Sequence, residues 1–306
     1  MTHSEIFIQQ LINGLTIGMI YALIALGYTM VYGIIQLINF AHGEIFMVGA
    51  FLGLTVFNLF SPALKLNSAL IIILMFVLAM CACGILGAII ERAAYRPLRK
   101  SPRLSCLITA IGVSFILQNL MMLAWGPVDK SFPAFFKHSA ITLGPLRITF
   151  MQGFIIITSL VMMGALHFFV TRTMLGKALR ATSEDMTAAR LMGINVDRAI
   201  GLCFLIGSAL GGAGGVMYGM YYNSISFHDG YLVGIKAFTA AVLGGIGNVP
   251  GAMLGGMALG MLEGLGAGYL SSEWKNVFAF LILVGLLLCW PSGILRKFRN
   301  EVTGQL

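Results

Sequence analysis

Apolar segments recur along the whole chain, and short stretches with charge, proline or glycine separate them. A helix of about 20 apolar residues covers the roughly 30 Å of hydrocarbon in a bilayer. Clear segments of this length lie at 68–90, 104–125, 150–171, 199–222 and 276–295. The pattern therefore predicts membrane-spanning helices along most of the sequence.

Three further regions are apolar but less regular. Residues 6–35 form an unusually long segment, so a helix there must tilt, kink or extend past the bilayer. Residues 40–60 form another, interrupted near the start by the letters AHGE. Residues 231–270 carry 11 glycines and are broken at Asn248 and Pro250. We expect two spans joined by a tight turn in this last region, and a re-entrant segment followed by one span is the alternative.

Charged residues make up 10% of the chain, against about 25% in soluble domains. So few charges cannot keep a protein surface in water, and no soluble domain fits between the apolar segments. The net charge of +8 comes largely from basic patches at 92–103, 172–198 and 296–299, which hold 13 of the 19 Lys and Arg residues. Basic loops are typical of the cytoplasmic side of membrane proteins, so this positive charge does not indicate a nucleic-acid-binding protein.

These features predict an all-α fold, a polytopic transmembrane helical bundle with eight or nine spans and one domain over residues 1–306. With the basic patches in the cytoplasm, the count is nine spans, the N-terminus lies outside and the C-terminus is cytoplasmic. Eight spans follow if 231–270 or the N-terminal region is interpreted differently. The first segment has no basic residue ahead of it and is too long for a signal peptide, so we expect a retained span.

Small residues also fit helix packing in lipid. Glycines recur at every fourth position in two late segments, which lets helix backbones approach closely. The two rows are Gly207, Gly211, Gly215 and Gly219, and Gly256, Gly260, Gly264 and Gly268. The five cysteines lie in or beside apolar segments without the spacing of metal ligands, so we expect buried packing residues and no metal site.

The sequence contains none of three common catalytic motifs. A nucleotide-binding P-loop needs G-x-x-x-x-G-K-[ST], and the one Gly-Lys pair, Gly176-Lys177, is followed by Ala178. The hydrolase elbow G-x-S-x-G and the zinc motif HExxH are absent, and the five histidines are scattered. We therefore expect a protein that is not an enzyme.

Ionisable side chains inside a membrane are costly to bury and often mark a functional site. Glu44 follows His42 and Asn39 closely, and Glu263 lies far from any segment end. The first three fit a proton relay or a polar lining, or else a satisfied polar cluster at a broken helix. Glu263 fits either a pathway lining or a packing hydrogen bond. All four are candidates for pathway or polar-break residues.

The segment 172–198 is too long for a simple connection, and we expect a short capped helix over 184–193. Acidic residues stand at its start, a basic residue lies near its end and a glycine follows, in agreement with the helix dipole. The residues that define it are Glu184, Asp185, Ala188, Ala189, Arg190 and Gly193. Such a cytoplasmic helix presents a rigid knob to a groove on a soluble partner, and a solvated connection is the alternative.

Four longer motifs, in the same order, resemble one family. They are GYTMVYG at 27–33, NFAHGE at 39–44, ER and YRPLR within 91–99, and KAFTAAVLGGIG at 236–247. The likeness extends through the segment 172–198 and covers nearly the whole chain. The sequence thus resembles the LivHM-type permeases of high-affinity branched-chain amino-acid ABC importers.

The resemblance implies a permease subunit for leucine, isoleucine and valine in the bacterial inner membrane. It implies a second, LivM-like permease, two ABC ATPases similar to LivG and LivF, and a periplasmic binding protein. The chain would bind no cofactor of its own, because ATP and Mg would be used by the partner ATPases.

The resemblance also implies a role for the segment 172–198. In related permeases, the ATPase docks on a loop with the pattern Ala-Ala-x-x-x-Gly, which Ala188, Ala189 and Gly193 match here. The fuller signature of other importers has Glu before the two alanines, and Thr187 stands at that position in this chain.

Three other functions compete with this interpretation. Similar permeases import urea, short amides or other amino acids, so the cargo can differ within the same architecture. A secondary transporter driven by protons or sodium is a second alternative, with ion sites at the broken helices. A membrane scaffold without transport is the third, and it leaves the intramembrane carboxylates without a purpose.

Overall fold

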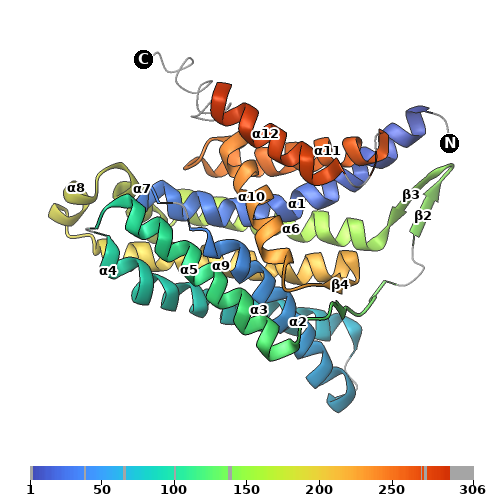
Figure 1. The fold of residues 1–306 in the computed structure, drawn as a ribbon, viewed down its shortest axis with the longest axis horizontal. Coiled ribbons are helices and arrows are strands. Elements are labelled where there is room, and N and C mark those ends of the chain that lie inside the picture. Colours follow the sequence, from blue (N-terminus) through green and yellow to red (C-terminus); the bar gives the residue numbers. More distant parts are fainter. Residues whose placement is uncertain are drawn as a thin grey trace.

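The computed structural model describes residues 3–37, 39–64, 67–99, 101–136, 140–269, 271 and 274–289. Long helices dominate this part of the chain (Figure 1). They are α1 (His3–Ile35), α2 (Ala41–Leu64), α3 (Ser68–Ile90), α5 (Arg103–Trp125), α6 (Phe150–Arg172), α9 (Val196–Tyr222), α10 (Asp229–Gly244), α11 (Val249–Tyr269) and α12 (Lys275–Cys289). The predicted all-α bundle is confirmed.

Each of the nine predicted spans overlaps one of these helices, and residues 290–295 of the last one lie outside the described residues. Six of them are long and apolar enough to cross a membrane: α1, α2, α3, α5, α6 and α9. The two helices α10 and α11 occupy the glycine-rich region, joined by a tight turn at 245–248, as expected. Neither of them, nor the shorter α12, is among the six candidate spans, so the predicted total of eight or nine spans stays a prediction. The third basic patch, at 296–299, and the C-terminus lie outside the described residues.

Short elements connect the long helices at the two ends of the molecule (Figure 1). One end carries the N-terminus and the hairpin of β2 (Ala140–Leu143) and β3 (Leu146–Thr149), in which Ala140 pairs with Thr149. Nearby, β1 (Lys130–Ser131) pairs with β4 (Ser224–Ile225). The other end carries α4 (Arg96–Leu98), α7 (Met174–Glu184) and α8 (Met186–Leu191).

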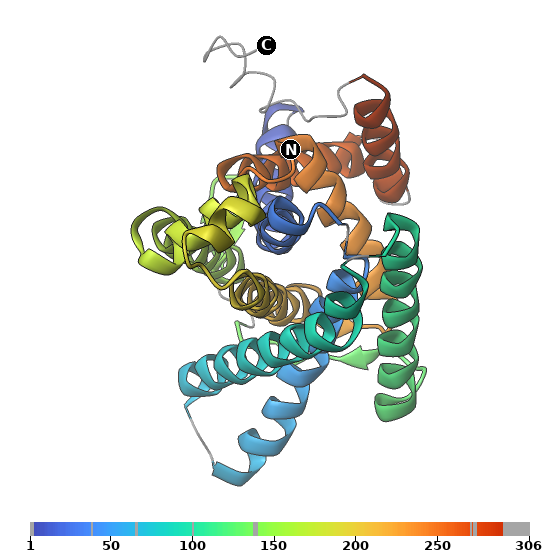
Figure 2. The same cartoon turned by 90° about the vertical axis from the view of Figure 1, so that its left-hand side faces the viewer.

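Helix α1 is the central element of the bundle. Viewed from the end that carries α7 and α8, its blue ribbon lies near the middle, between α9 and the pair α10 and α11 (Figure 2). Most of its residues from Gly14 to Ile34 are buried. An apolar stretch of this kind fits either a protein core or a lipid-facing span by pattern alone. The packing of α9, α10 and α11 around it places α1 in the core of the bundle, away from lipid.

Glycines allow α11 to lie against α1 with their backbones in contact. A Cβ atom placed on Gly18 would lie 2.9 Å from the carbonyl oxygen of Gly256, and one on Gly14 would lie 2.8 Å from the Cα of Met261. In the other predicted row, Gly207 on α9 approaches the Cα of Gly27 to 3.1 Å by the same measure. Both rows therefore serve close helix packing, as the spacing predicts.

A leucine at Gly18 is expected to destabilise the protein strongly. Its side chain would enter the backbone of α11, and overpacking of this kind typically costs about 1–3 kcal/mol or more. Gly112→Leu on α5 is the matched control, because no atom lies within 4 Å of a Cβ there. Thermal unfolding in detergent should show a large loss for Gly18→Leu and little change for Gly112→Leu. Equal melting temperatures would contradict the packing.

The cysteine prediction is partly wrong. Cys83, Cys106 and Cys203 are buried, whereas Cys81 and Cys289 are exposed. The exposed pair lies on the outer faces of α3 and α12, where a small apolar residue can face lipid as readily as core. Across the described residues, no group of three or more His, Cys, Asp or Glu side chains could hold a metal ion.

Candidate functional site

The connection between α6 and α9 contains two helices, where the sequence predicts one. The predicted capped helix is α8, and α7 precedes it with the single residue Asp185 between them, so Glu184 belongs to α7. The Thr173 hydroxyl caps α7 by accepting a hydrogen bond from the Gly176 N–H at 3.0 Å. The sequence does carry a signal for α7 that was not used, because its apolar and polar residues separate onto opposite faces of the helix, and the buried residues are Gly176, Leu179 and Thr182.

Both ends of α8 are fixed by local hydrogen bonds. The Asp185 carboxylate accepts from the backbone N–H groups of Thr187 at 2.6 Å and Ala188 at 3.0 Å. These N–H groups, that of Ala188 most strongly, hold the pKa of the Asp185 carboxyl below its usual range. At the other end, Gly193 adopts φ +82° and the Ile194 N–H donates to the Ala189 carbonyl, which closes the helix. The predicted cap and glycine stop are confirmed.

The tip of α8 exposes two large apolar side chains. Leu191 is 85% exposed and Met192 is 82% exposed, while Ala189 is buried against the rest of the connection. Ala188 and Arg190 are also exposed. Exposed apolar groups on a polar end of a protein mark a surface for a partner. The sequence pattern predicts a role for Ala188, Ala189 and Arg190, whereas Leu191 and Met192 were not predicted.

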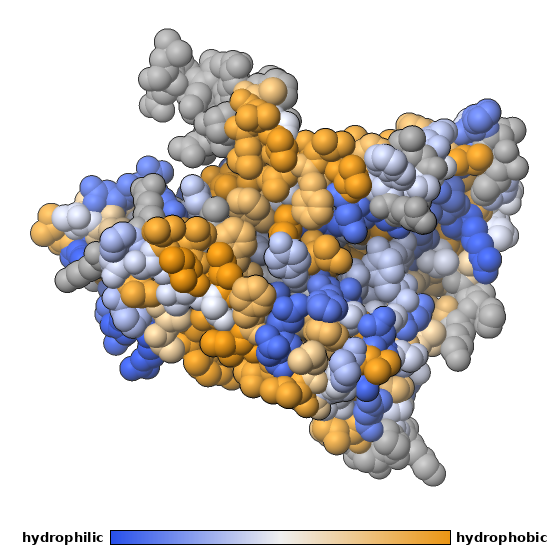
Figure 3. Space-filling view, viewed as in Figure 1, coloured by the Kyte–Doolittle hydropathy of each residue, from blue (hydrophilic) through white to orange (hydrophobic). Residues whose placement is uncertain are grey.

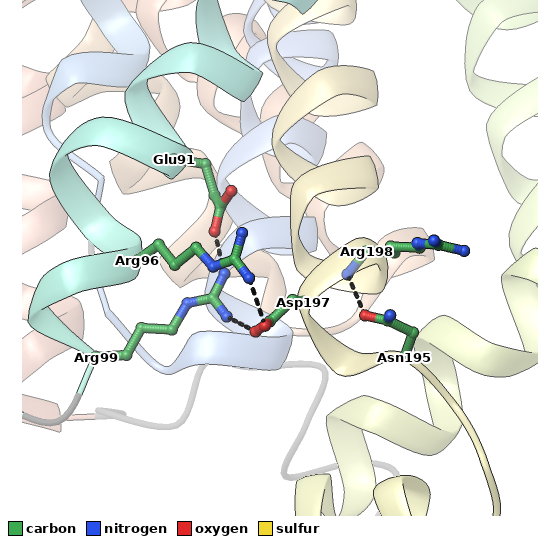
Figure 4. Close-up of polar contacts among 6 residues, drawn as sticks. All are labelled: Glu91, Arg96, Arg99, Asn195, Asp197 and Arg198. Carbon is green, nitrogen blue, oxygen red and sulfur yellow. Dashed lines mark hydrogen bonds and ion pairs between the residues drawn. The ribbon is translucent and has the colours of Figure 1, made fainter.

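An ion-pair cluster holds the far end of this connection (Figure 4). The Asp197 carboxylate, at the start of α9, accepts from Arg96 at 2.8 Å and from Arg99 at 2.6 Å. Arg99 also pairs with the buried Glu91. Beside it, the Asn195 side chain caps α9 by accepting from the Arg198 N–H at 3.1 Å. Two arginines of the first basic patch therefore connect α4 to α9, in addition to any role in setting the orientation of the chain in the membrane.

The polar residues at the start of α2 are buried. The Asn39 side chain accepts a hydrogen bond from the Tyr95 hydroxyl at 2.8 Å. The His42 ring packs edge-on against Tyr28, with 4.7 Å between ring centroids. The Glu44 carboxylate accepts from the Ser114 hydroxyl at 3.1 Å. Its second oxygen, and Nε2 of His42, have no hydrogen-bond partner in the described part of the chain.

Glu263 lies apart from this group and is fully paired. One oxygen accepts from the Lys236 ammonium at 2.9 Å and the other from the Tyr21 hydroxyl at 3.0 Å. All three side chains are buried, and they come from α11, α10 and α1. The arrangement joins three helices in the middle of the bundle, so it supports the packing interpretation of Glu263 over the pathway interpretation.

A hydrophilic patch interrupts the apolar surface where α5 meets the start of α10 (Figure 3). The Gln118 side-chain nitrogen on α5 and Nδ1 of His228 lie 3.0 Å apart there, in an exposed hydrogen bond. A cavity of about 60 Å³ lies between the two helices, and Ser114 and Gly230 form part of its wall. Glu44 lies directly behind this wall, through its hydrogen bond with Ser114.

The chain is similar to bacterial permeases over nearly its full length. Residues 10–287 match the family model described as "Branched-chain amino acid transport system / permease component". The high-affinity branched-chain amino acid transport system permease protein LivH of Salmonella typhimurium is 45% identical over 295 residues, which is 95% of this chain and 96% of that protein. LivH of Escherichia coli gives the same identity and coverage. The corresponding protein BraD of Pseudomonas aeruginosa is 44% identical over 295 residues, 95% of this chain and 96% of that protein. No solved structure matches the chain.

Proposed function

The chain belongs to the family of branched-chain amino acid transport system permeases, and we propose that it imports leucine, isoleucine and valine across the bacterial inner membrane. It is a multi-pass permease subunit without catalytic activity of its own, and such a permease implies partner ATPases, a second permease and a binding protein. The finer proposal is a LivM-like second permease, LivG- and LivF-like ATPases that use ATP and Mg, and a periplasmic binding protein. The near full-length likeness to three curated permeases of this system carries the proposal.

We place the end with α7 and α8 in the cytoplasm and the hairpin of β2 and β3 outside. The basic residues of the segment 172–198 favour this orientation. The helix α8 then faces the ATPases and is the coupling helix. Its docking surface consists of the predicted and exposed residues Asp185, Ala188, Arg190 and Gly193, with Leu191 and Met192 added as apolar anchors. Of the other two predicted residues, Ala189 packs the helix against the connection and Glu184 ends α7.

The anchors at both ends of the coupling segment support a mechanical role. The helix α7 contacts α1 and α6, and Asp197 holds the start of α9 against α4. A displacement of α8 by the closing ATPases would therefore move α7 and α9 with it. Because α9 packs along α1, α2 and α3, the displacement would reach the whole bundle. A two-state switch of this kind needs contacts that differ between the inward- and outward-open forms.

The cap of α8 provides a direct check on this role. Asp185→Ala removes the acceptor for two N–H groups, so the helix should fray and ATP-driven uptake should fall several-fold. Asp185→Asn should keep most of the uptake, because Asn caps helices about as well as Asp. Since the pKa of Asp185 is lowered in the folded protein, the cap is present near neutral pH and is lost only as pH falls through that lowered value. Equal uptake by the Ala and Asn variants would contradict the role of the cap.

The pathway is proposed to run along the α5 and α10 face. Glu44 lies behind the cavity there, and the hydrophilic patch at Gln118 and His228 would be costly against lipid. When this face packs against the second permease, the same patch would line a polar translocation pathway between the two subunits. Asn39 and His42 would support the start of α2 beside it, and Glu263 would hold the core together.

Uptake by purified components tests the proposed function. We expect proteoliposomes with both permeases and both ATPases to accumulate labelled leucine only when ATP is inside and the binding protein is outside. The same vesicles with labelled urea or acetamide serve as the control for the alternative cargo. Uptake of leucine by the permease alone under a proton or sodium gradient would replace the proposal with a secondary transporter. Transport of urea or amides but not leucine would keep the architecture and reject the cargo.

A further inference from the structure

Two adjoining cavities lie at the same end of the molecule as the coupling helix. The larger, about 380 Å³, is bounded by the end of α1, the end of α7 and the turn between α10 and α11. The smaller, about 70 Å³, lies between the same elements and α9. Gly33, Ser183 and Gly247 line both, so the two cavities adjoin, and together they are called the bipartite cavity.

The two parts differ in chemistry. The larger part is lined by hydrogen-bonding groups, among them Tyr32, Gln36 and Asn248, and its one charged lining residue in the described part is Glu184. The smaller part is mainly apolar, and its walls include Met30, Ile34, Val170, Leu179 and Val249. Polar and apolar compartments side by side fit a small molecule with one charged end and one hydrocarbon end.

Opposite charges stand at the junction of the two parts. Arg180 lines the smaller part and Glu184 the larger, one turn apart on α7. They form no ion pair with each other in the described structure, and Arg180 donates only a long hydrogen bond, 3.3 Å, to the Thr171 carbonyl. The order Arg before Glu along a helix is also the weaker one for such a pair. Both residues are exposed, so their charged groups are free to receive a carboxylate and an ammonium on one ligand.

A buried hydroxyl without a partner points to the same place. Thr29 on α1 lines the smaller part and is 1% exposed, yet its Oγ1 has no hydrogen-bond partner among the described residues. A buried polar group without a partner costs free energy that a bound ligand can recover. Gln36, which lines the larger part, adopts a left-handed backbone conformation with φ +55°. Residues other than glycine rarely adopt this conformation, because it costs free energy.

We propose that this bipartite cavity binds a small apolar α-amino acid from the cytoplasmic side and that binding slows the transport cycle. The inference rests on the proposed function for the orientation of α7 and α8. Glu184 would receive the ammonium, Arg180 the carboxylate, and the smaller part the hydrocarbon side chain. Because only Asp185 separates α7 from α8, a ligand that clamps α7 against α1 and the 245–248 turn restrains the coupling helix. The product of import thus limits its own entry.

The test uses the complete permease–ATPase complex in lipid nanodiscs, where both faces are open to solution. The binding protein is added already saturated with leucine, so further leucine can act only at another site. We expect millimolar free leucine to lower the stimulated ATPase rate at least about fivefold, within the usual range of coupling between sites. Two fragments of leucine, 4-methylpentanoate without the ammonium and 3-methylbutylamine without the carboxylate, should not inhibit.

Variants of the lining residues test whether the inhibition arises at this cavity. Arg180→Gln, Glu184→Gln and Thr29→Val should each reduce the ratio of the rates without and with excess leucine toward one. Lys177→Glu is the matched control, since Lys177 is exposed on the same helix and lines neither part. Binding of labelled leucine to the complex without binding protein gives a second readout, and the same variants should weaken it.

Three outcomes are decisive. Inhibition and binding that persist in Arg180→Gln and Glu184→Gln would overturn the site. Absence of both in the wild-type complex would do the same. A complex whose ATPase ignores the binding protein but still binds leucine at these residues would reject the proposed function and keep the site.

Discussion

Replacing Leu191 and Met192 together with Asp is expected to reduce ATP-driven leucine uptake by about 100-fold or more, because buried anchors at the centre of an interface each contribute about 2 kcal/mol or more. The two side chains are the most exposed of the large apolar groups in the described part of the chain, and they lie at the C-terminal end of α8. In the free permease they contact little, so their loss should leave the fold and membrane insertion intact. Uptake and ATP hydrolysis are measured in the same vesicles.

The matched control exchanges the same two residues without adding charge. Leu191→Met with Met192→Leu keeps the apolar volume and should retain most of the uptake. The double Asp variant should also lose stimulation of the ATPases by the binding protein. If its uptake equals that of the control, the tip of α8 is not where the ATPase binds.

Lys236→Met alone is expected to destabilise the protein by about 3–5 kcal/mol, because it leaves the buried Glu263 carboxylate without its charge partner. The ammonium also lies 5.9 Å from the centroid of the Tyr21 ring, and the substitution removes this favourable contact. Yield and thermal unfolding in detergent report the loss. We expect little folded protein at temperatures where the wild type is stable.

The double variant separates a charge effect from a packing effect. Lys236→Met with Glu263→Gln removes both charges, and the amide oxygen of the new side chain can still accept from the Tyr21 hydroxyl, which lies 3.0 Å from the carboxylate in the wild type. The double variant should recover most of the stability lost by the single variant. A double variant as unstable as Lys236→Met would show that the cost comes from the shape of the lysine side chain.

The helices could be predicted from the sequence because lipid imposes a simple rule. Each span needs about 20 apolar residues, and the segments at 68–90 and 104–125 meet it without ambiguity. A break in the glycine-rich region was also visible, but it was predicted at 248–251, whereas the turn lies at 245–248 and Val249, Pro250 and Gly251 begin α11. The hairpin at 140–149 was not visible, since its strands are four residues each and their pairing depends on the loop around Gly144.

Of the two helices in the segment 172–198, only one was predicted from the sequence. Asp185 and Gly193 are strong local signals for the ends of a helix, so α8 could be placed. The helix α7 was not predicted, although its apolar and polar residues separate onto opposite faces and Thr173 caps its start. Leu191 and Met192 were overlooked because apolar residues in a short helix usually suggest burial, and these two are exposed.

The ion pairs depend on how the packed helices are aligned along one another, and a sequence pattern does not give this alignment. Glu263 could be recognised as costly in a membrane, but its pairing with Lys236 follows from how the 245–248 turn folds α11 back along α10. Arg96 and Arg99 were assigned to orientation alone, and their partner Asp197 lies about 100 residues away along the chain. Only the fold brings these charges together.

The claim that this permease receives its energy through α8 is tested most directly by a photo-crosslinker at position 191. Benzoylphenylalanine in place of Leu191, in the complete complex in its native membrane, should form a covalent product with an ATPase subunit on illumination, and ATP should change its yield. The same residue in place of Ile157, exposed on α6, is the control and should capture no ATPase. Absence of the ATPase product at position 191, with transport intact, would contradict this claim.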